Sequence, residues 1–166
     1  MATLKPGDSF PSGVVFTYIP PTGTLDLLVC GLPTKYDASK ELQTKKTVLV
    51  AVPGAFTPTC QEQHITSYLA NLDNLRAKGV DRVIFIASND AFVMSAWGKA
   101  NGVKDESILF MSDTNADFSR SIGWANGDRT ARYALVVDHG KVVYAGIDTQ
   151  RGSIANSGAE GVLAKL

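Results

Sequence analysis

Blocks of apolar and polar residues along this chain predict strands alternating with helices. Two runs of mostly apolar, β-branched residues, 47–52 and 81–88, are typical of short buried strands. After the first run, apolar residues recur at helical spacing and the pattern stops at Gly79, which predicts a helix over 58–78. The remaining pattern predicts strands at 13–19, 24–30, 108–111, 131–137 and 141–145, helices at 39–45, 91–101, 116–122 and 155–163, and a loop at 31–38.

The order of these elements is that of the thioredoxin fold. Strand, helix, strand and helix precede a hairpin and a last helix, an order that favours an α/β fold with a mixed central sheet flanked by helices. The strands before residue 31 would form an N-terminal strand extension. Because no repeat, linker or low-complexity tract interrupts the 166 residues, we expect one domain over 1–166.

Composition excludes several classes of function. Sixteen basic and sixteen acidic residues give zero formal charge, and no basic stripe suggests nucleic acid. No apolar run is long enough to span a membrane, and two cysteines do not make a secreted disulfide framework. We therefore expect a cytoplasmic protein, a peroxisomal one, or both. Ala164-Lys165-Leu166 resembles a Ser-Lys-Leu peroxisomal address, although it is also a plain helix end.

Cys60 follows the first buried strand, just inside the start of the predicted helix. Thr57 is a suitable N-cap and Pro58 then occupies the first helical position. Unpaired backbone N–H groups and the positive end of the helix dipole favour a thiolate at such a place. The alternative is a small, inert cysteine packed beneath the helix start.

The residues around Cys60 resemble the active-site signature of the peroxiredoxins. That signature, Pro-x-x-x-Thr-x-x-Cys, corresponds here to Pro53, Thr57 and Cys60. The run 53–60 with His64 is similar to the peroxiredoxin-five (type II) subfamily, and segments 89–98 and 121–124 extend the match over nearly the whole chain. Fungal members resemble it most, among them thiol peroxidases known as mould allergens or peroxisomal membrane proteins.

The resemblance implies a thiol-dependent peroxidase. Cys60 would reduce hydrogen peroxide and alkyl hydroperoxides and become a sulfenic acid. Thr57 would contact both sulfur and peroxide, Pro53 would shield the pocket, and Arg132 would follow the charge as it moves to the leaving oxygen. Arg129 is the less favoured arginine. No cofactor is implied.

His64 lies one helical turn beyond Cys60, so both side chains share a face. It is either a base, as in a cysteine hydrolase, or a structural hydrogen-bonding residue, and we favour the second. His139 is predicted in a hairpin turn facing solvent. Paired cysteines at zinc spacing are absent from the sequence, so we expect no metal.

Cys30 is the candidate resolving cysteine. Many relatives in the subfamily carry this residue near the C-terminus, where this chain has none, whereas fungal relatives with a similarly placed cysteine form disulfides between subunits. The resemblance therefore implies a homodimer, with Phe56 near its interface, and recycling by thioredoxin. If Cys30 is instead a buried strand-end residue, glutathione or glutaredoxin would reduce the sulfenic acid. A peroxide-sensing switch or holdase is the other alternative.

Overall fold

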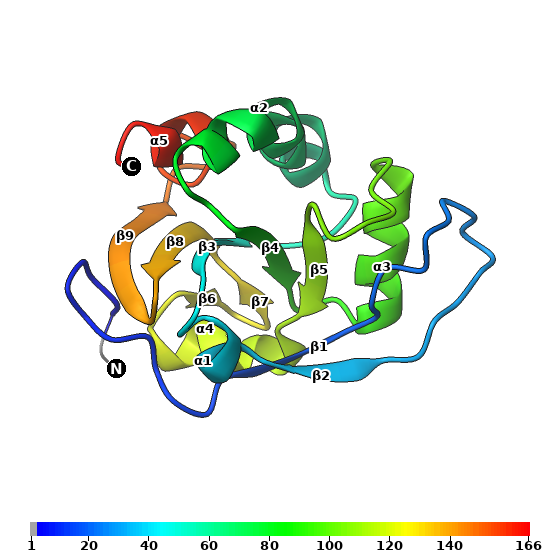
Figure 1. Cartoon of the computed structure of the whole chain (residues 1–166), viewed down its shortest axis with the longest axis horizontal. Helices are drawn as coiled ribbons and strands as arrows, with labels where there is room; N and C mark the ends of the chain where they lie inside the picture. The colour runs from blue at the N-terminus through cyan, green and yellow to red at the C-terminus, as the bar shows by residue number, and fades with distance from the viewer. Residues whose placement is uncertain (1–2) are drawn as a thin grey trace.

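The computed structural model describes residues 3–166, which form a mixed sheet with helices on both faces (Figure 1). Its seven strands follow the order β2-β1-β5-β4-β3-β8-β9, and a separate two-stranded ribbon joins β6 to β7. The strands are β1 (Val15–Tyr18), β2 (Thr34–Asp37), β3 (Lys46–Ala51), β4 (Arg82–Ala87), β5 (Leu109–Ser112), β6 (Ala125–Asn126), β7 (Arg129–Thr130), β8 (Arg132–Asp138) and β9 (Lys141–Asp148). The helices are α1 (Ala38–Glu41), the π-helical turn η1 (Cys60–His64), α2 (Ile65–Ala77), α3 (Ala91–Ala100), the 3₁₀ turn η2 (Thr114–Ala116), α4 (Asp117–Ser121) and α5 (Ala159–Leu163).

Strand β3 lies inside the sheet between β4 and β8 and is buried on both faces. It pairs in parallel with β4 and antiparallel with β8, so that Val48 stands beside Val83 on one side and Val136 on the other. Successive β3 side chains alternate between two cores: Val48 and Val50 join one, and Leu49 and Ala51 join the other. This double burial explains why the strand is a continuous apolar run.

The two cores lie on opposite faces of the sheet. In Figure 1, α2 and α5 lie on one side, α1 and α4 lie on the other, and α3 stands beside β5. The first core is organised around the fully buried Phe85 ring, which meets Tyr68 at 5.2 Å and Trp97 at 5.8 Å, both edge to face. Phe16 and Phe118 contribute to the second core.

The predicted thioredoxin-like α/β fold is confirmed, and so is the order of its central elements. The segment 24–30, however, was predicted as a strand and is an irregular loop. Asp26 N–H donates to Thr24 Oγ1 and Leu28 N–H donates to Asp26 Oδ1, so these local turns compete with strand pairing.

The partner of β1 is instead β2, inside the segment 31–38 that was predicted as a loop. The register pairs Val15 with Asp37 and Tyr18 with Thr34. Tyr36 is buried and packs edge to face on Tyr18, at 5.6 Å between ring centroids. This aromatic contact stabilises a strand that lacks apolar alternation in its sequence.

Gly98 of α3 leaves room for the Phe110 ring of β5. A Cβ at Gly98 would lie 2.6 Å from Phe110 Cδ2, too close for van der Waals contact. Alanine in a helix normally stabilises relative to glycine. Here we expect Gly98→Ala to lower the free energy of unfolding by about 1–3 kcal/mol, because the clash of the new methyl group with Phe110 costs more than the higher helix propensity of alanine gains. Urea denaturation measures the change, with Ser95→Ala in the same helix as control, and a stabilised Gly98→Ala would contradict the packing.

Candidate active site

Cys60 is fully buried where β3 gives way to the helix that contains η1 and α2. The helix begins at Pro58, as predicted, and Gln61 N–H donates to the Thr57 carbonyl at 2.8 Å. In the described part of the chain no backbone N–H donates to the Thr57 side chain, so the predicted side-chain cap is absent; its hydroxyl instead donates backwards to Gly54 O at 2.7 Å. This bond closes the preceding loop tightly. It also uses the hydroxyl proton, so the Thr57 oxygen can only accept from a further partner.

The same loop is fixed from outside by one further contact. Ala55 N–H donates to Asn89 Oδ1 at 2.9 Å, from the loop after β4. Phe56 adopts a positive φ of 62° and is half exposed. The loop is therefore held at both ends, with an aromatic ring facing outward at its tip.

Arg132 brings a positive charge to the Cys60 sulfur. It is the first residue of β8, and because Tyr133 is in register with Ala51, Arg132 lies beside the carboxyl end of β3. Its Nη2 donates to Cys60 Sγ at 3.2 Å and its Nη1 donates to His64 Nδ1 at 3.0 Å. The planar guanidinium can make both contacts at once, which a lysine cannot.

His64 is a buried, neutral acceptor in this arrangement. Its Nε2 lies 3.0 Å from the Ser157 carbonyl, which can only accept, so Nε2 carries the proton and Nδ1 is free to accept from Arg132. Burial lowers the pKa of His64 to about 4; the Ser157 contact opposes the shift and the Arg132 charge assists it. The ring therefore stays uncharged at neutral pH.

The Ser157 carbonyl is itself held in place from two sides. Tyr68 Oη donates to it at 2.6 Å. Asp148, the last residue of β9, accepts from Ser157 N–H at 2.9 Å and from its hydroxyl at 2.6 Å. Burial opposes ionisation of Asp148, yet hydrogen bonds from Ser157, Asn156 and Ser153 lower the pKa of its carboxyl group.

A cavity of about 580 Å³ is lined by Arg132, whose guanidinium contacts the buried Cys60 sulfur. Pro53 and Thr57 also line it, together with Ile147 and Arg151. The structure thus brings Cys60, Thr57, Pro53, Arg132 and His64 into one site, as the sequence suggested. A small molecule in the cavity can reach groups that contact Cys60.

Two candidates from the sequence do not contact the Cys60 sulfur. Arg129, in β7, places its guanidinium near Gly54 of the active-site loop, whereas Arg132 is the arginine that reaches Cys60. Cys30 is exposed on the irregular loop between β1 and β2, so the alternative of a buried strand-end cysteine is wrong. Both cysteines are free thiols.

Sequence reasoning missed two groups that support the site. One is the Ser157 carbonyl; a backbone acceptor carries no side-chain signal. The other is the side chain of Gln61, which accepts from Trp97 Nε1 at 2.7 Å and donates to Asn101 Oδ1 at 2.7 Å. Trp97 was expected only as a core or pocket-wall residue.

Within residues 3–166, no three or more His, Cys, Asp and Glu side chains gather closely enough to bind a metal ion. Over the same residues, no helix has the length and apolar character needed to cross a membrane.

Comparison with known proteins gives consistent matches along the whole chain. The Redoxin family model matches residues 5–163. Peroxiredoxin AHP1 of Chaetomium thermophilum is 69% identical, covering 100% of this chain and 96% of its own length. A putative peroxisomal peroxiredoxin of Lipomyces kononenkoae is 46% identical over 96% of this chain and 99% of its own. The crystal structure of reduced Prx3 from Vibrio vulnificus in complex with H2O2 has a TM-score of 0.84 and 34% identity, covering 98% of this chain and 95% of that one.

The neutral state of His64 makes stability depend on pH. The unfolded chain binds a proton on His64 near pH 6.5, whereas the folded chain does so only near pH 4. Stability is therefore full above pH 6.5 and is lost as pH falls toward 4, by about 3 kcal/mol in all. Urea denaturation between pH 7 and 4 should show this slope in the wild type and a flatter one in His64→Gln. Parallel curves for the two proteins would contradict a neutral His64.

Proposed function

Since this chain belongs to the Redoxin family and is a peroxiredoxin, a thiol peroxidase, we propose that Cys60 is its peroxidatic nucleophile. The substrates are hydrogen peroxide and alkyl hydroperoxides. The observation that carries the proposal is the contact of Arg132 Nη2, 3.2 Å from a fully buried sulfur, by an arginine that also lines an open cavity. A buried thiolate needs a paired positive charge, and this contact supplies one.

The reaction follows from that geometry. The Cys60 thiolate attacks one peroxide oxygen; an S–O bond forms, the O–O bond breaks, and the electron pair leaves with the other oxygen. That oxygen takes up a proton and departs as water or an alcohol, while Cys60 becomes a sulfenic acid. Charge moves from sulfur to the leaving oxygen, and the remaining N–H groups of Arg132 stabilise it there.

Thr57 and Pro53 orient the peroxide. The Thr57 hydroxyl proton is committed to Gly54 O, so its oxygen acts as an acceptor for the peroxide O–H. Pro53 lines the same cavity and has no N–H to compete for the substrate. Together they direct the peroxide toward the sulfur in a nearly fixed position.

His64 acts as a positioning residue rather than a base. Its Nδ1 lone pair accepts from Arg132 and its Nε2 proton is directed at Ser157 O, so neither nitrogen is free to take a proton from Cys60. The ring instead holds the guanidinium at the angle that reaches the sulfur.

We assign resolution to Cys30 of a second subunit in a homodimer. The Cys30 thiol attacks the sulfenic sulfur, an S–S bond forms and water leaves, after which thioredoxin reduces the disulfide. The exposed Cys30 loop supports this assignment, since it is accessible to another chain. Phe56, half exposed at the rim of the active-site loop, is expected at the dimer interface. Without a resolving Cys30, glutathione or glutaredoxin would recycle the enzyme.

We place the enzyme in the cytoplasm, the peroxisome or both, working as one domain. The 46% identical peroxisomal relative supports the second location. Leu166 packs against the core beside α5, so a receptor that reads Ala164-Lys165-Leu166 would first have to detach it.

Replacing the proposed nucleophile and its partner tests the site directly. Cys60→Ser should abolish peroxide turnover while the fold is kept. Arg132→Met should slow the first oxidation by about a hundredfold or more, the usual effect of losing one preorganised donor. Stopped-flow peroxide consumption measures both. Arg129→Met is the matched control, and a crippled Arg129→Met beside an active Arg132→Met would show that the other arginine is catalytic.

The role of Cys30 is tested on non-reducing gels. Peroxide should convert the wild type to a covalent dimer and leave Cys30→Ser monomeric on the gel. The variant should still form the sulfenic acid once per Cys60 and should lose turnover with thioredoxin. Full thioredoxin-linked activity in Cys30→Ser would exclude Cys30 as the resolving residue.

A further inference from the structure

Helix α3 contacts both segments that bear a cysteine. On one side is Gln61, the neighbour of Cys60, whose Oε1 accepts from Trp97 Nε1 at 2.7 Å and from Asn101 Nδ2 at 3.1 Å. Its Nε2 donates to Asn101 Oδ1 at 2.7 Å. Trp97 is fully buried, so the first turn of the Cys60 helix is anchored to a rigid part of the core.

On the other side is Lys99, whose side chain reaches the Cys30 loop. It is 8% exposed, and its Nζ donates to Asp26 O at 3.1 Å and to Val29 O. Val29 is the residue before Cys30. No carboxylate lies within ion-pair distance of Lys99 among the residues the structure describes. A buried ammonium group held only by backbone carbonyls ties the loop to the helix.

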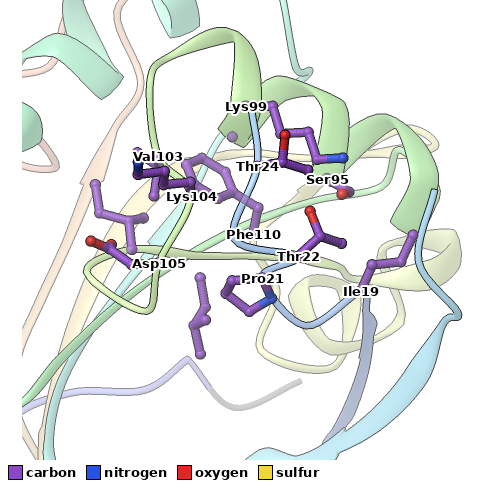
Figure 2. Close-up of a pocket in the computed structure, with 13 residues that line it drawn as sticks. Ile19, Pro21, Thr22, Thr24, Ser95, Lys99, Val103, Lys104, Asp105 and Phe110 are labelled. Carbon is purple, nitrogen blue, oxygen red and sulfur yellow. The ribbon is translucent and has the colours of Figure 1, made fainter. Parts of the chain in front are cut away.

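Little else fastens this loop. In the described part of the chain, the two Lys99 bonds are the recorded hydrogen bonds that join residues 20–32 to other segments. Figure 2 shows Lys99 from α3 and Thr22 and Thr24 from the loop around a cavity of about 30 Å³, room for one or two waters. The apolar side chains of the loop are turned to solvent: Leu25, Leu27, Leu28, Val29 and Leu32.

We propose that α3 is a double clasp that holds both cysteine segments in their reduced positions and so limits the rate of disulfide formation. This rests on the proposed function, in which Cys30 resolves Cys60. A disulfide needs the two Cα atoms within about 7 Å, so the fully buried Cys60 must leave its place, and a freer Cys30 loop reaches it more readily. Breaking the Gln61 bonds frees the first; breaking the Lys99 bonds frees the second.

The clasp then sets the fate of the sulfenic acid. Either Cys30 displaces water from it to form the disulfide, or a second hydroperoxide adds another oxygen and leaves as water or alcohol, giving the sulfinic acid. The two reactions compete for one intermediate. A tight clasp slows the first, and the enzyme becomes easier to inactivate at high peroxide.

Two variants loosen the clasp without touching the reacting groups. Lys99→Met keeps the length of the side chain and removes its bonds to the loop, with the exposed Lys104→Met as control. Asn101→Ala removes two bonds to Gln61 and keeps the Trp97 bond, with the exposed Asn74→Ala as control. Rapid mixing with peroxide, followed by a dimedone trap for sulfenic acid and a non-reducing gel, separates the two steps.

In each clasp variant, sulfenic acid should form at the wild-type rate and the disulfide about thirtyfold faster, the effect of losing two typical hydrogen bonds. The peroxide concentration that gives half sulfinic acid should rise by a similar factor, and the controls should match wild type. A clasp variant that forms the disulfide at the wild-type rate or slower overturns the proposal for its half of the clasp.

If the proposed function itself is wrong, the result differs from failure of the clasp, because the wild type would then form no Cys30–Cys60 disulfide. Amide hydrogen exchange in reduced protein tests the clasp in that case. Lys99→Met should raise exchange at residues 24–30 about thirtyfold over Lys104→Met, again the effect of losing two hydrogen bonds. Unchanged exchange overturns the clasp whatever the role of Cys30.

Discussion

The site depends on one guanidinium group placed between a buried sulfur and a buried imidazole. Arg132 donates to Cys60 Sγ and to His64 Nδ1 at once, and neither acceptor has bulk water to replace it. Arg132 supplies a fixed positive charge to a sulfur inside the core, and that charge stays in place only while His64 is neutral. The register of β8 against β3 brings the arginine to the carboxyl end of β3. The same strand pairing is therefore needed for the sheet and for the contact between Arg132 and Cys60.

The contacts that make Cys60 reactive also hold it in place. The tight loop that commits the Thr57 proton to Gly54 and the Ser157 carbonyl that fixes the His64 tautomer hold the groups around Cys60 where peroxide meets them. Peroxide attack needs that fixed geometry, whereas disulfide formation needs it to break. The hydrogen bonds of α3 determine the balance between these two requirements. They hold both segments that bear a cysteine, and they contact neither reacting sulfur.

The sequence predicted the central sheet because β3 and β4 are buried on both faces and read as unbroken apolar runs. The motif around Cys60 and the arginine that opens β8 could be recognised by their resemblance to the peroxiredoxin signature. The strand expected at 24–30 was wrong, since the turn made by Asp26 competes locally with pairing. Strand β2 was missed because the tertiary contacts of Tyr36, with the Tyr18 ring and the Arg82 side chain, leave no apolar alternation in its sequence. A backbone carbonyl partner for His64, and contacts between Gln61 and α3, require the tertiary fold and leave no trace in composition or spacing.

The ionisation and tautomer of His64 report most directly on the arrangement of Arg132. ¹⁵N NMR of ring-labelled histidine in the reduced enzyme, with His64→Gln to assign the signals, measures both between pH 7 and pH 5. With the pKa of His64 lowered to about 4, the ring should remain neutral over this range, with the proton on Nε2 and Nδ1 accepting from Arg132. A ring that is protonated by pH 6, or that carries its proton on Nδ1, would contradict the account, because Arg132 could not then donate to it and to Cys60 together.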